Sequence, residues 1–412
     1  MISFEKYTLS NGLTVILHTD NTSPLLALNL IYKVGSRNEH PERTGLAHLL
    51  EHVMFEGTNK IPHYNEALQG VGGENNAYTN TDITNYYLSV PAQHLETALM
   101  LEADRMTNLA FIPEKFNIQR DVVIEEFKQR YLTHPFNDIS LLLKPLCYKK
   151  HPYRWNTIGM DIRHIAETSL DEAKVFYTTY YCPDNAILSL AGNLDIEQSK
   201  ALIEKYFGNI PKGNIRPSVL PKEPLQKESR WLEVERDVPC DMLIIAFHGS
   251  KRSEKDYYPT QLISHLLSNG DSSILQENLT QKKKIFTHME TSLTETFDRG
   301  LFIINGIPAN GISLQTAEEA VWTELEQLKN KRIKSKQLEK IKNKTLTLWY
   351  FSEINIQTKA RLLGVFEAMD KAERIQKEEQ LYQNVDKDNI KEVSRKLFRK
   401  TNSSTIYYKA KN

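Results

Sequence analysis

The stretch GLAHLLEHVMFEGT, residues 45–58, places two histidines and a glutamate in an otherwise apolar segment. If this stretch is helical, its leucine and valine side chains fill one broad arc, and His48, Glu51 and His52 share a stripe on the other side. His48 and His52 are one helical turn apart, a spacing that suits two imidazoles binding one Zn²⁺. Glu51 lies beside them, where its carboxylate can take a proton from water. The alternative is a solvated polar face of an ordinary helix.

A catalytic zinc site also needs a third protein ligand and an open fourth position. A second helix is expected over PEKFNIQRDVVIEEFKQR, residues 113–130, with Pro113 in its first turn. On a helical wheel Glu126 lies between two valines, so its carboxylate faces a partly apolar surface, where an unpaired charge is costly. This position favours Glu126 over Glu125 as the third ligand. Glu125 is expected either to face outward or to support the ligands from behind, and the alternative for both is an ordinary charged helix surface.

Length and composition exclude several classes of protein. A chain of 412 residues predicts more than one domain. Lys+Arg and Asp+Glu both total 52, which argues against a nucleic acid partner. No apolar run is long enough for a membrane span, and the N-terminus shows no signal peptide. We expect a cytoplasmic protein, or a periplasmic one if a leader has been removed. Three scattered cysteines make neither a disulfide framework nor a zinc ribbon: Cys147, Cys182 and Cys240.

The chain divides into two parts that resemble each other. Four prolines among polar residues, the first of them Pro211, mark residues 213–226 and the few residues before them as a linker. Beyond it, DMLIIAFHGS and TQLISHLLSNG repeat the pattern of LLALNLIYKVGS and TGLAHLLEHVMFEG. In this alignment His265, Ser268 and Asn269 stand where the first copy has His48, Glu51 and His52. We expect a zinc-binding catalytic domain over residues 1–212 and a homologous domain with a degenerate motif over residues 227–412.

Four motifs together resemble those of the pitrilysin/insulinase family of zinc peptidases, which includes the mitochondrial processing peptidase. The first is HLLEH followed by VMFEGT. The second is QRDVVIEE, which ends at Glu126. The 73 residues between His52 and Glu126 are close to the gap usual in the family. The third and fourth are GGENNAYTNTDITNYY (72–87) and YYCPDNAILSLAGNLD (180–195). The resemblance is strong to about residue 210 and weak beyond, and it is nearest to short bacterial members and the beta subunit of the processing peptidase.

The resemblance implies an α+β protein with two homologous α/β halves, in the duplicated metallohydrolase fold of the mitochondrial processing peptidase, forming half of a clamshell. It implies one Zn²⁺ per chain, bound by His48, His52 and Glu126. It also implies an edge strand that binds extended peptide, with Asn75, Asn76, Ala77 and Tyr78 contacting the substrate. A short polar strand beside Gly-Gly suits peptide addition by backbone pairing. A plain edge strand is the alternative.

The sequence departs from the family at three positions. Active members carry an arginine and a tyrosine in the second half that bind substrate, whereas this chain has Thr280 and Thr287 there. Neither threonine supplies a guanidinium fork or a phenol. Many relatives carry a glutamate seven residues before the third ligand, where this chain has Gln119. A related subunit that lacks the zinc motif would supply the missing arginine and tyrosine in a heterodimer. A homodimer remains open.

These expectations define an enzyme, a zinc metalloendopeptidase acting on peptides or unfolded segments, with Glu51 as the general base. One rival is a catalytically weak or silent homologue that acts as a peptide-binding or assembly subunit. A second rival is a non-peptidase metalloenzyme, since a quorum-signal lyase also carries HxxEH. That lyase family has a much shorter, single-domain chain, so the duplicated layout argues against it.

Overall fold

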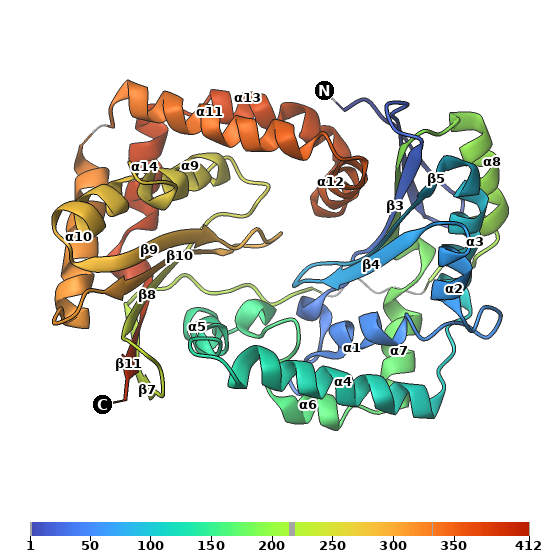
Figure 1. Cartoon of the computed structure of the whole chain (residues 1–412), viewed down its shortest axis with the longest axis horizontal. Coiled ribbons are helices and arrows are strands. Elements are labelled where there is room, and N and C mark those ends of the chain that lie inside the picture. Colours follow the sequence, from blue (N-terminus) through green and yellow to red (C-terminus); the bar gives the residue numbers. More distant parts are fainter. Residues whose placement is uncertain (1, 214–218, 332, 412) are drawn as a thin grey trace. The chain divides into compact units, whose positions relative to one another are not determined.

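A computed structural model describes residues 2–213, 219–331 and 333–411 (Figure 1). The chain groups into two compact units. Unit 1 contains Met1–Arg130, Trp155–Pro221 and Tyr350–Gln376. Unit 2 contains Tyr131–Arg154, Lys222–Trp349 and Lys377–Asn412. Among the residues described, no helix combines the length and apolar character that crossing a bilayer requires.

Unit 1 contains a six-stranded sheet in the order β1-β2-β6-β3-β5-β4. Its strands are β1 (Glu5–Thr8), β2 (Thr14–Thr19), β3 (Leu25–Tyr32), β4 (Glu74–Thr79), β5 (Thr84–Pro91) and β6 (Ala186–Gly192). The central strands β3 and β6 are nearly continuous apolar runs and are buried along almost their whole length, as strands covered on both faces require. The strand β4 is polar and forms one edge.

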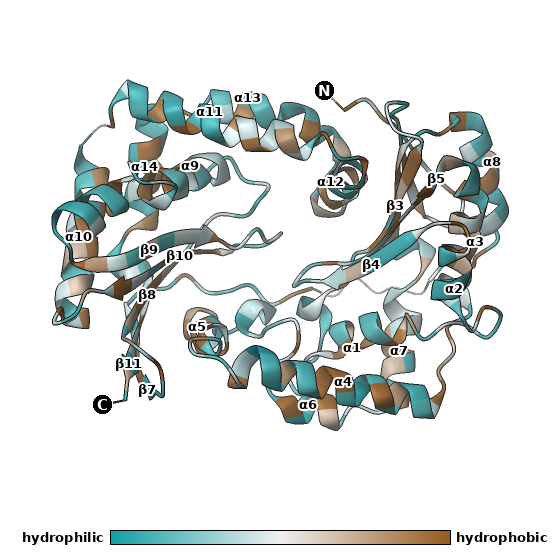
Figure 2. Cartoon of the chain, in the orientation of Figure 1, coloured by the Kyte–Doolittle hydropathy of each residue, from teal (hydrophilic) through white to brown (hydrophobic). Residues whose placement is uncertain are grey.

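The sheet of unit 1 is accompanied by helices, among them the two that carry the predicted ligands. They are α1 (Leu46–Val53), α2 (Tyr64–Gln69), α3 (Leu95–Thr107), α4 (Pro113–Leu132), α6 (Ile162–Ala166), α7 (Leu170–Tyr180), α8 (Ile196–Phe207) and α12 (Ile356–Met369). Hydrophilic and hydrophobic residues alternate along α4 (Figure 2), and its buried residues are Phe116, Val123 and Phe127. This spacing is that of a helix with one buried face.

Unit 2 repeats the sheet of unit 1 without its first strand. Its strands are β7 (Arg230–Arg236), β8 (Met242–His248), β9 (Phe286–Leu293), β10 (Leu301–Pro308) and β11 (Ser403–Ala410). The order β7-β11-β8-β10-β9 matches β2-β6-β3-β5-β4 strand for strand. The directions match as well, because β7 and β11 are parallel, as β2 and β6 are, and every other neighbouring pair is antiparallel. The predicted α+β fold with two similar halves is thus confirmed.

The helices of unit 2 are α5 (Ile139–Cys147), α9 (Tyr257–Ser268), α10 (Leu314–Asn330), α11 (Ser335–Ser352), α13 (Glu378–Gln383) and α14 (Lys387–Leu397). The helix α9 follows β8 as α1 follows β3, so it is the counterpart of the helix that carries HLLEH. This order agrees with the sequence repeat.

Each unit includes a helix from the sequence of the other half. In unit 1, α12 packs on β3 and β6, with Ala360 against Ala27 and Ala191. A Cβ atom on Gly364 would lie 2.6 Å from Ile31 Cδ1, so this close packing needs a glycine in α12. In unit 2, α5 packs on the sheet strands β7, β8 and β11.

The two units therefore differ from the division at residue 212 that the sequence suggested. Residues 350–376 belong to unit 1 and residues 131–154 to unit 2, because each sheet has an apolar face that must be covered. The homologous domains at 1–212 and 227–412 stay a prediction, and residues 214–218 of the predicted linker lie outside the described residues.

Candidate metal centre

The N-terminus of α1 is held by a buried carboxylate. Glu39 accepts hydrogen bonds from the backbone N–H groups of Gly45 and Ala47, at 2.9 Å each. Burial raises the pKa of Glu39 to about 8, against the effect of these N–H donors. Gly45 has a φ of 94°, and a Cβ there would lie 2.6 Å from the carbonyl oxygen of Ile158. The start of the helix thus requires glycine at this position and an acceptor for its first N–H groups.

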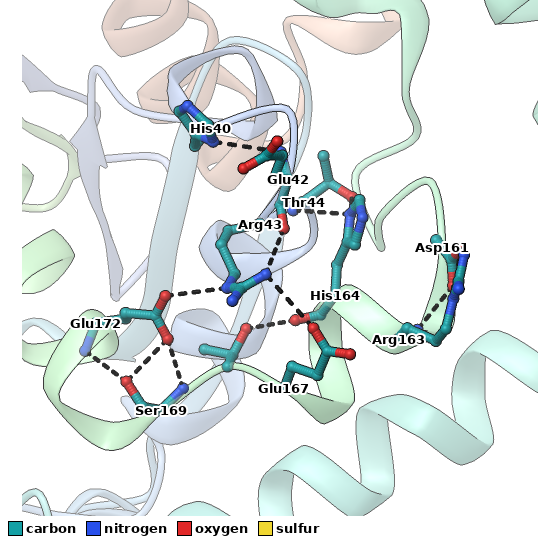
Figure 3. A network of polar contacts seen from close by, with 11 residues as sticks. His40, Glu42, Arg43, Thr44, Asp161, Arg163, His164, Glu167, Ser169 and Glu172 are labelled. Atoms are coloured by element: carbon teal, nitrogen blue, oxygen red, sulfur yellow. Dashed lines mark hydrogen bonds and ion pairs between the residues drawn. The ribbon is translucent and has the colours of Figure 1, made fainter.

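Polar contacts tie the loop before α1 to α6 and α7 (Figure 3). The hydroxyl oxygen of Thr44 accepts the backbone N–H of Met160 at 2.8 Å and lies 2.8 Å from His164 Nδ1. The guanidinium of Arg43 lies 3.0 Å from Glu172 Oε1. These contacts, all within unit 1, orient the helix that presents the predicted ligands.

We expect replacement of Glu39 with alanine to lower the free energy of unfolding by about 1–3 kcal/mol, because two buried N–H groups lose their acceptor. Urea denaturation of the zinc-free protein measures this. The matched control is Glu42→Ala, which removes an exposed glutamate from the same loop and is expected to change stability by less than about 0.5 kcal/mol. Equal stability of the two variants would contradict the role given to Glu39.

The three predicted ligands come together from α1 and α4. Glu126 Oε2 lies 3.7 Å from His48 Nε2 and 3.4 Å from His52 Nε2. One donor atom from each residue lies within 4.8 Å of the others, and in the described part of the chain no other group of three or more His, Cys, Asp or Glu residues is this close. The structure thus brings together a helix pair separated by about 60 residues in sequence, as the ligand hypothesis requires.

The electrostatics of the cluster follow from burial and from Glu126. Burial lowers the pKa of His48. For His52, burial acts in the same direction, but the hydrogen bond and negative charge of Glu126 outweigh it and raise the pKa. The hydrogen bond to His52 in turn lowers the pKa of Glu126. Glu126 is therefore held ionised, and also pairs with Arg130 at 3.4 Å.

Glu51 lies beside this cluster on α1. The Thr79 hydroxyl of β4 donates a hydrogen bond to Glu51 Oε2 at 2.5 Å. Burial raises the pKa of Glu51, while the contact with Thr79 lowers it. The carboxylate is thus fixed in direction and more basic than an exposed glutamate, which suits a group that accepts a proton.

The donor set fits a zinc ion. Two imidazole nitrogens and one carboxylate oxygen are the ligand types of catalytic Zn²⁺ sites, in which the protein supplies three ligands. Without a metal ion, a carboxylate beside two neutral, largely buried imidazoles is unfavourable, and one imidazole would have to carry an extra proton to pair with it. The chemistry of these residues therefore agrees with the predicted ligands His48, His52 and Glu126.

Glu125 faces outward, which was one of the two expectations for it. Its side chain is 61% exposed, and its carboxylate pairs with Lys128 at 2.5 Å. Gln119, also on α4, does contact a predicted ligand from behind, since its Oε1 lies 3.3 Å from His52 Nδ1.

The predicted substrate residues Asn75, Asn76, Ala77 and Tyr78 all lie on β4, the edge strand whose end contacts α1. The N–H of Ala77 donates to the Asn76 side chain at 2.8 Å rather than to β5, so it points to the free edge. Their position is the one expected, and their contact with substrate stays a prediction.

Sequence reasoning missed Glu39 and Thr79. Thr79 stands in the quoted motif GGENNAYTNTDITNYY, one residue beyond the predicted substrate residues, but its partner Glu51 is on another element. Glu39 comes six residues before the helix cap and carries no local signal of its role. Contacts between distant segments give no periodic pattern in the sequence.

Unit 2 preserves the arrangement but keeps only the first of the two histidines. The imidazole of His265 on α9 lies 2.8 Å from the Thr345 hydroxyl of α11. The Ser268 hydroxyl lies 2.7 Å from that of Thr291 on β9, as Glu51 contacts Thr79 on β4. Lys344 Nζ lies 2.6 Å from Asn269 Oδ1, so a lysine ammonium group contacts the residue that aligns with His52.

Thr280 and Thr287, the positions at which the resemblance places the family arginine and tyrosine, are also in unit 2. Thr280 lies in the π-helix Gln276–Lys282, and Thr287 lies on β9 with its hydroxyl 3.2 Å from the carbonyl oxygen of Ile307. Neither side chain has the reach of an arginine or a tyrosine, and neither carries the positive charge of an arginine.

Known proteins share both halves of this chain. The family model of the insulinase family (peptidase family M16) matches residues 14–142, and that of the peptidase M16 inactive domain matches residues 168–345. The zinc protease PqqE of Helicobacter pylori is 28% identical over 418 residues, covering 98% of this chain and 92% of that protein. The zinc protease YmxG of Bacillus subtilis is 29% identical over 342 residues, covering 82% and 81%.

Solved structures agree with these similarities. The crystal structure of a protease from Helicobacter pylori superposes with a TM-score of 0.92 at 26% identity, covering 99% of this chain and 100% of that chain. A peptidase M16 inactive domain from Pseudomonas fluorescens shares the fold, with a TM-score of 0.89 at 19% identity, and covers 100% of this chain and 98% of its own. With HLLEH, the distant glutamate on α4 and the repeated sheet, these matches show that the chain belongs to the pitrilysin/insulinase family, peptidase family M16.

Proposed function

We propose that this protein is a zinc-dependent endopeptidase that hydrolyses peptides or unfolded polypeptide segments. The observation that carries the proposal is the convergence of His48, His52 and Glu126 around one point, with the carboxylate of Glu51 beside them. Relatives that align along most of the chain are named zinc proteases, which supports the same reaction class.

Each residue has a defined part in the proposed reaction. A bound zinc ion supplies Lewis acidity, which polarises the scissile carbonyl and makes water more acidic. His48, His52 and Glu126 would hold the ion. Glu51 accepts the proton of the attacking water and returns it to the leaving amine, and Thr79 keeps its carboxylate in place for both transfers.

The substrate is proposed to bind as an extended strand along β4. Because Ala77 N–H points away from β5, the edge offers backbone groups to an added strand. Pairing through the backbone selects for unfolded chain rather than for a particular side chain. Asn75, Asn76, Ala77 and Tyr78 are the proposed contacts.

We propose further that a homologous subunit without the zinc motif completes the enzyme. Thr280 and Thr287 stand where active members carry an arginine and a tyrosine, so this chain lacks groups that steady the reaction. A partner chain that carries them would supply them in a heterodimer, and a homodimer would not. The proposed site still binds one zinc ion in each copy of this chain.

The same two threonines favour a second candidate function. A chain without the substrate-binding arginine and tyrosine can serve as a peptide-binding or assembly subunit whose catalysis is weak or silent. The retained carboxylate of Glu51 argues against this candidate, because binding alone does not need a buried proton acceptor.

Metal analysis and native mass spectrometry test the proposal. We expect one zinc ion per chain, lost in His48→Ala and kept in His265→Ala, the matched histidine of unit 2. Peptide cleavage should appear with the co-purified partner, stop with a chelator and return with zinc. Zinc binding without cleavage, in the presence of the partner, would favour the assembly subunit. A wild-type chain that binds no zinc would overturn both the metal assignment and the peptidase.

A further inference from the structure

A line of polar side chains runs behind His52, away from the proposed zinc. His52 Nδ1 lies 3.3 Å from Gln119 Oε1. The Gln119 amide nitrogen donates a hydrogen bond to Glu56 Oε1. Lys115, one turn before Gln119 on α4, lies with its ammonium 3.6 Å from Glu56 Oε2 and donates to the Glu56 backbone oxygen at 2.7 Å. The line thus joins α1, the turn after it and α4.

The chemistry of the groups decides the direction of each hydrogen bond. An ionised carboxylate only accepts, so the NH₂ group of Gln119 must face Glu56 and its oxygen must face His52. An amide oxygen also only accepts, so His52 Nδ1 must carry the hydrogen. In the neutral ring the lone pair of His52 is then on Nε2, the nitrogen that faces Glu126. Glu56 therefore specifies, through Gln119, the tautomer that can bind a metal.

The other histidine has no such support. His48 Nδ1 is buried, and within the described residues no hydrogen-bond partner reaches it. Apart from the Glu126 carboxylate, 3.7 Å from Nε2, that ring is surrounded by packed groups, and its side chain is 10% exposed, whereas the His52 side chain is 25% exposed. The polar line is thus found at the histidine that needs it more.

The charge of Glu56 can act on His52 because the line is partly shielded from solvent. The side chain of Glu56 is 23% exposed, and that of Lys115 is 35% exposed. A hydrogen bond that ends on a carboxylate polarises the intervening amide and strengthens the one beyond it. This polarisation makes Nε2 of His52 a better electron-pair donor to a cation.

We propose that Gln119 and Glu56 are positioning residues that fix the tautomer of His52 and raise its affinity for zinc. The Gln119 amide contacts His52 directly and relays the effect of the Glu56 carboxylate, which does not. The inference rests on the proposed function, because it assumes that His52 binds zinc. It assigns to Glu56 a part in the metal site that its position in the turn after α1 does not reveal.

Zinc dissociation constants, measured by competition with a chromophoric chelator, test the relay. Gln119→Leu removes the acceptor of the Nδ1 hydrogen and is expected to weaken zinc binding about 10- to 100-fold. Glu56→Gln keeps the shape but removes the charge, and a weakening of about 3- to 10-fold is expected, below the full loss of the contact. The matched control is Glu125→Gln on the same helix, whose carboxylate faces Lys128; its zinc affinity should equal that of the wild type.

A double variant distinguishes positioning from packing. Gln119→Glu/Glu56→Gln exchanges the carboxylate and the amide, so an acceptor again faces His52 and a donor faces that acceptor. We expect zinc affinity to return to within about 3-fold of the wild type or better. Urea denaturation of the zinc-free proteins checks that all variants fold.

The outcomes separate the two proposals. Equal zinc affinity in the wild type, Gln119→Leu and Glu56→Gln would overturn the relay and leave the zinc site standing. Weak binding by the double variant, as weak as by Gln119→Leu, would also overturn it, because the exchange preserves the hydrogen-bond pattern. Absence of zinc from the wild type would overturn the proposed function, and the relay with it.

Discussion

Replacement of Glu51 with glutamine is expected to lower kcat/KM for an internally quenched peptide by about 10²- to 10⁴-fold, the usual contribution of a positioned general base. Glutamine has the same shape, and its amide oxygen can still accept the Thr79 hydroxyl that now binds Glu51 Oε2 at 2.5 Å. It cannot accept a proton at neutral pH. The loss should therefore appear in kcat, with little change in KM.

Two measurements make this result specific. Zinc content of Glu51→Gln should equal that of the wild type, because Glu51 is not among the three converging ligands. Glu125→Gln, a similar change at an exposed glutamate, should keep full activity. Unchanged hydrolysis in Glu51→Gln would show that another group takes the proton. The assay includes the co-purified partner, so that weak activity of the isolated chain is not mistaken for loss of the base.

The second large effect concerns stability. Residues 1–212 and 227–412, produced separately, are each expected to lack a cooperative unfolding transition. The first fragment lacks α12, which covers β3 and β6, and the second lacks α5, which covers β7, β8 and β11. Each sheet would expose an apolar face to water. The fragment would then lose a large part of the hydrophobic free energy that stabilises a domain.

Co-expression of the two fragments is the control. Together they contain both exchanged helices, so a complex with a cooperative transition near that of the intact chain is expected, as followed by circular dichroism during heating. Cooperative unfolding of either fragment alone, with its near-ultraviolet signal intact, would show that the exchanged helices are dispensable. Packing of Ala360 and Gly364 against the sheet would then contribute little.

Much of the site was accessible to sequence reasoning because its signals are local. His48 and His52 are one turn apart on a single helix, so their common direction follows from helix geometry alone. Glu126 was favoured over Glu125 by its apolar neighbours and singled out by the family resemblance, and α4 begins at Pro113 as expected. The polarity of β4 likewise placed Asn75–Tyr78 at an edge.

The repeat was only partly visible in the sequence. The segment around His265 resembles the segment around His48, but the aligned stretch is short. The structure extends the similarity to five strands in the same order and directions. It also shows that the hydroxyl contact between Ser268 and Thr291 replaces the contact between Glu51 and Thr79. A conserved arrangement with changed side chains leaves little trace in amino-acid identity.

By itself, then, the sequence determined which helix bears the two imidazoles, which distant acid accompanies them, and that the chain is a duplicated α+β protein. Only the tertiary structure decided that Thr79 contacts Glu51, that Gln119 lies between Glu56 and His52, and that α5 and α12 are exchanged between the units. The physical reason is that sequence periodicity reports whether a side chain faces the core or the solvent. Which distant group it meets there depends on the packing of whole elements.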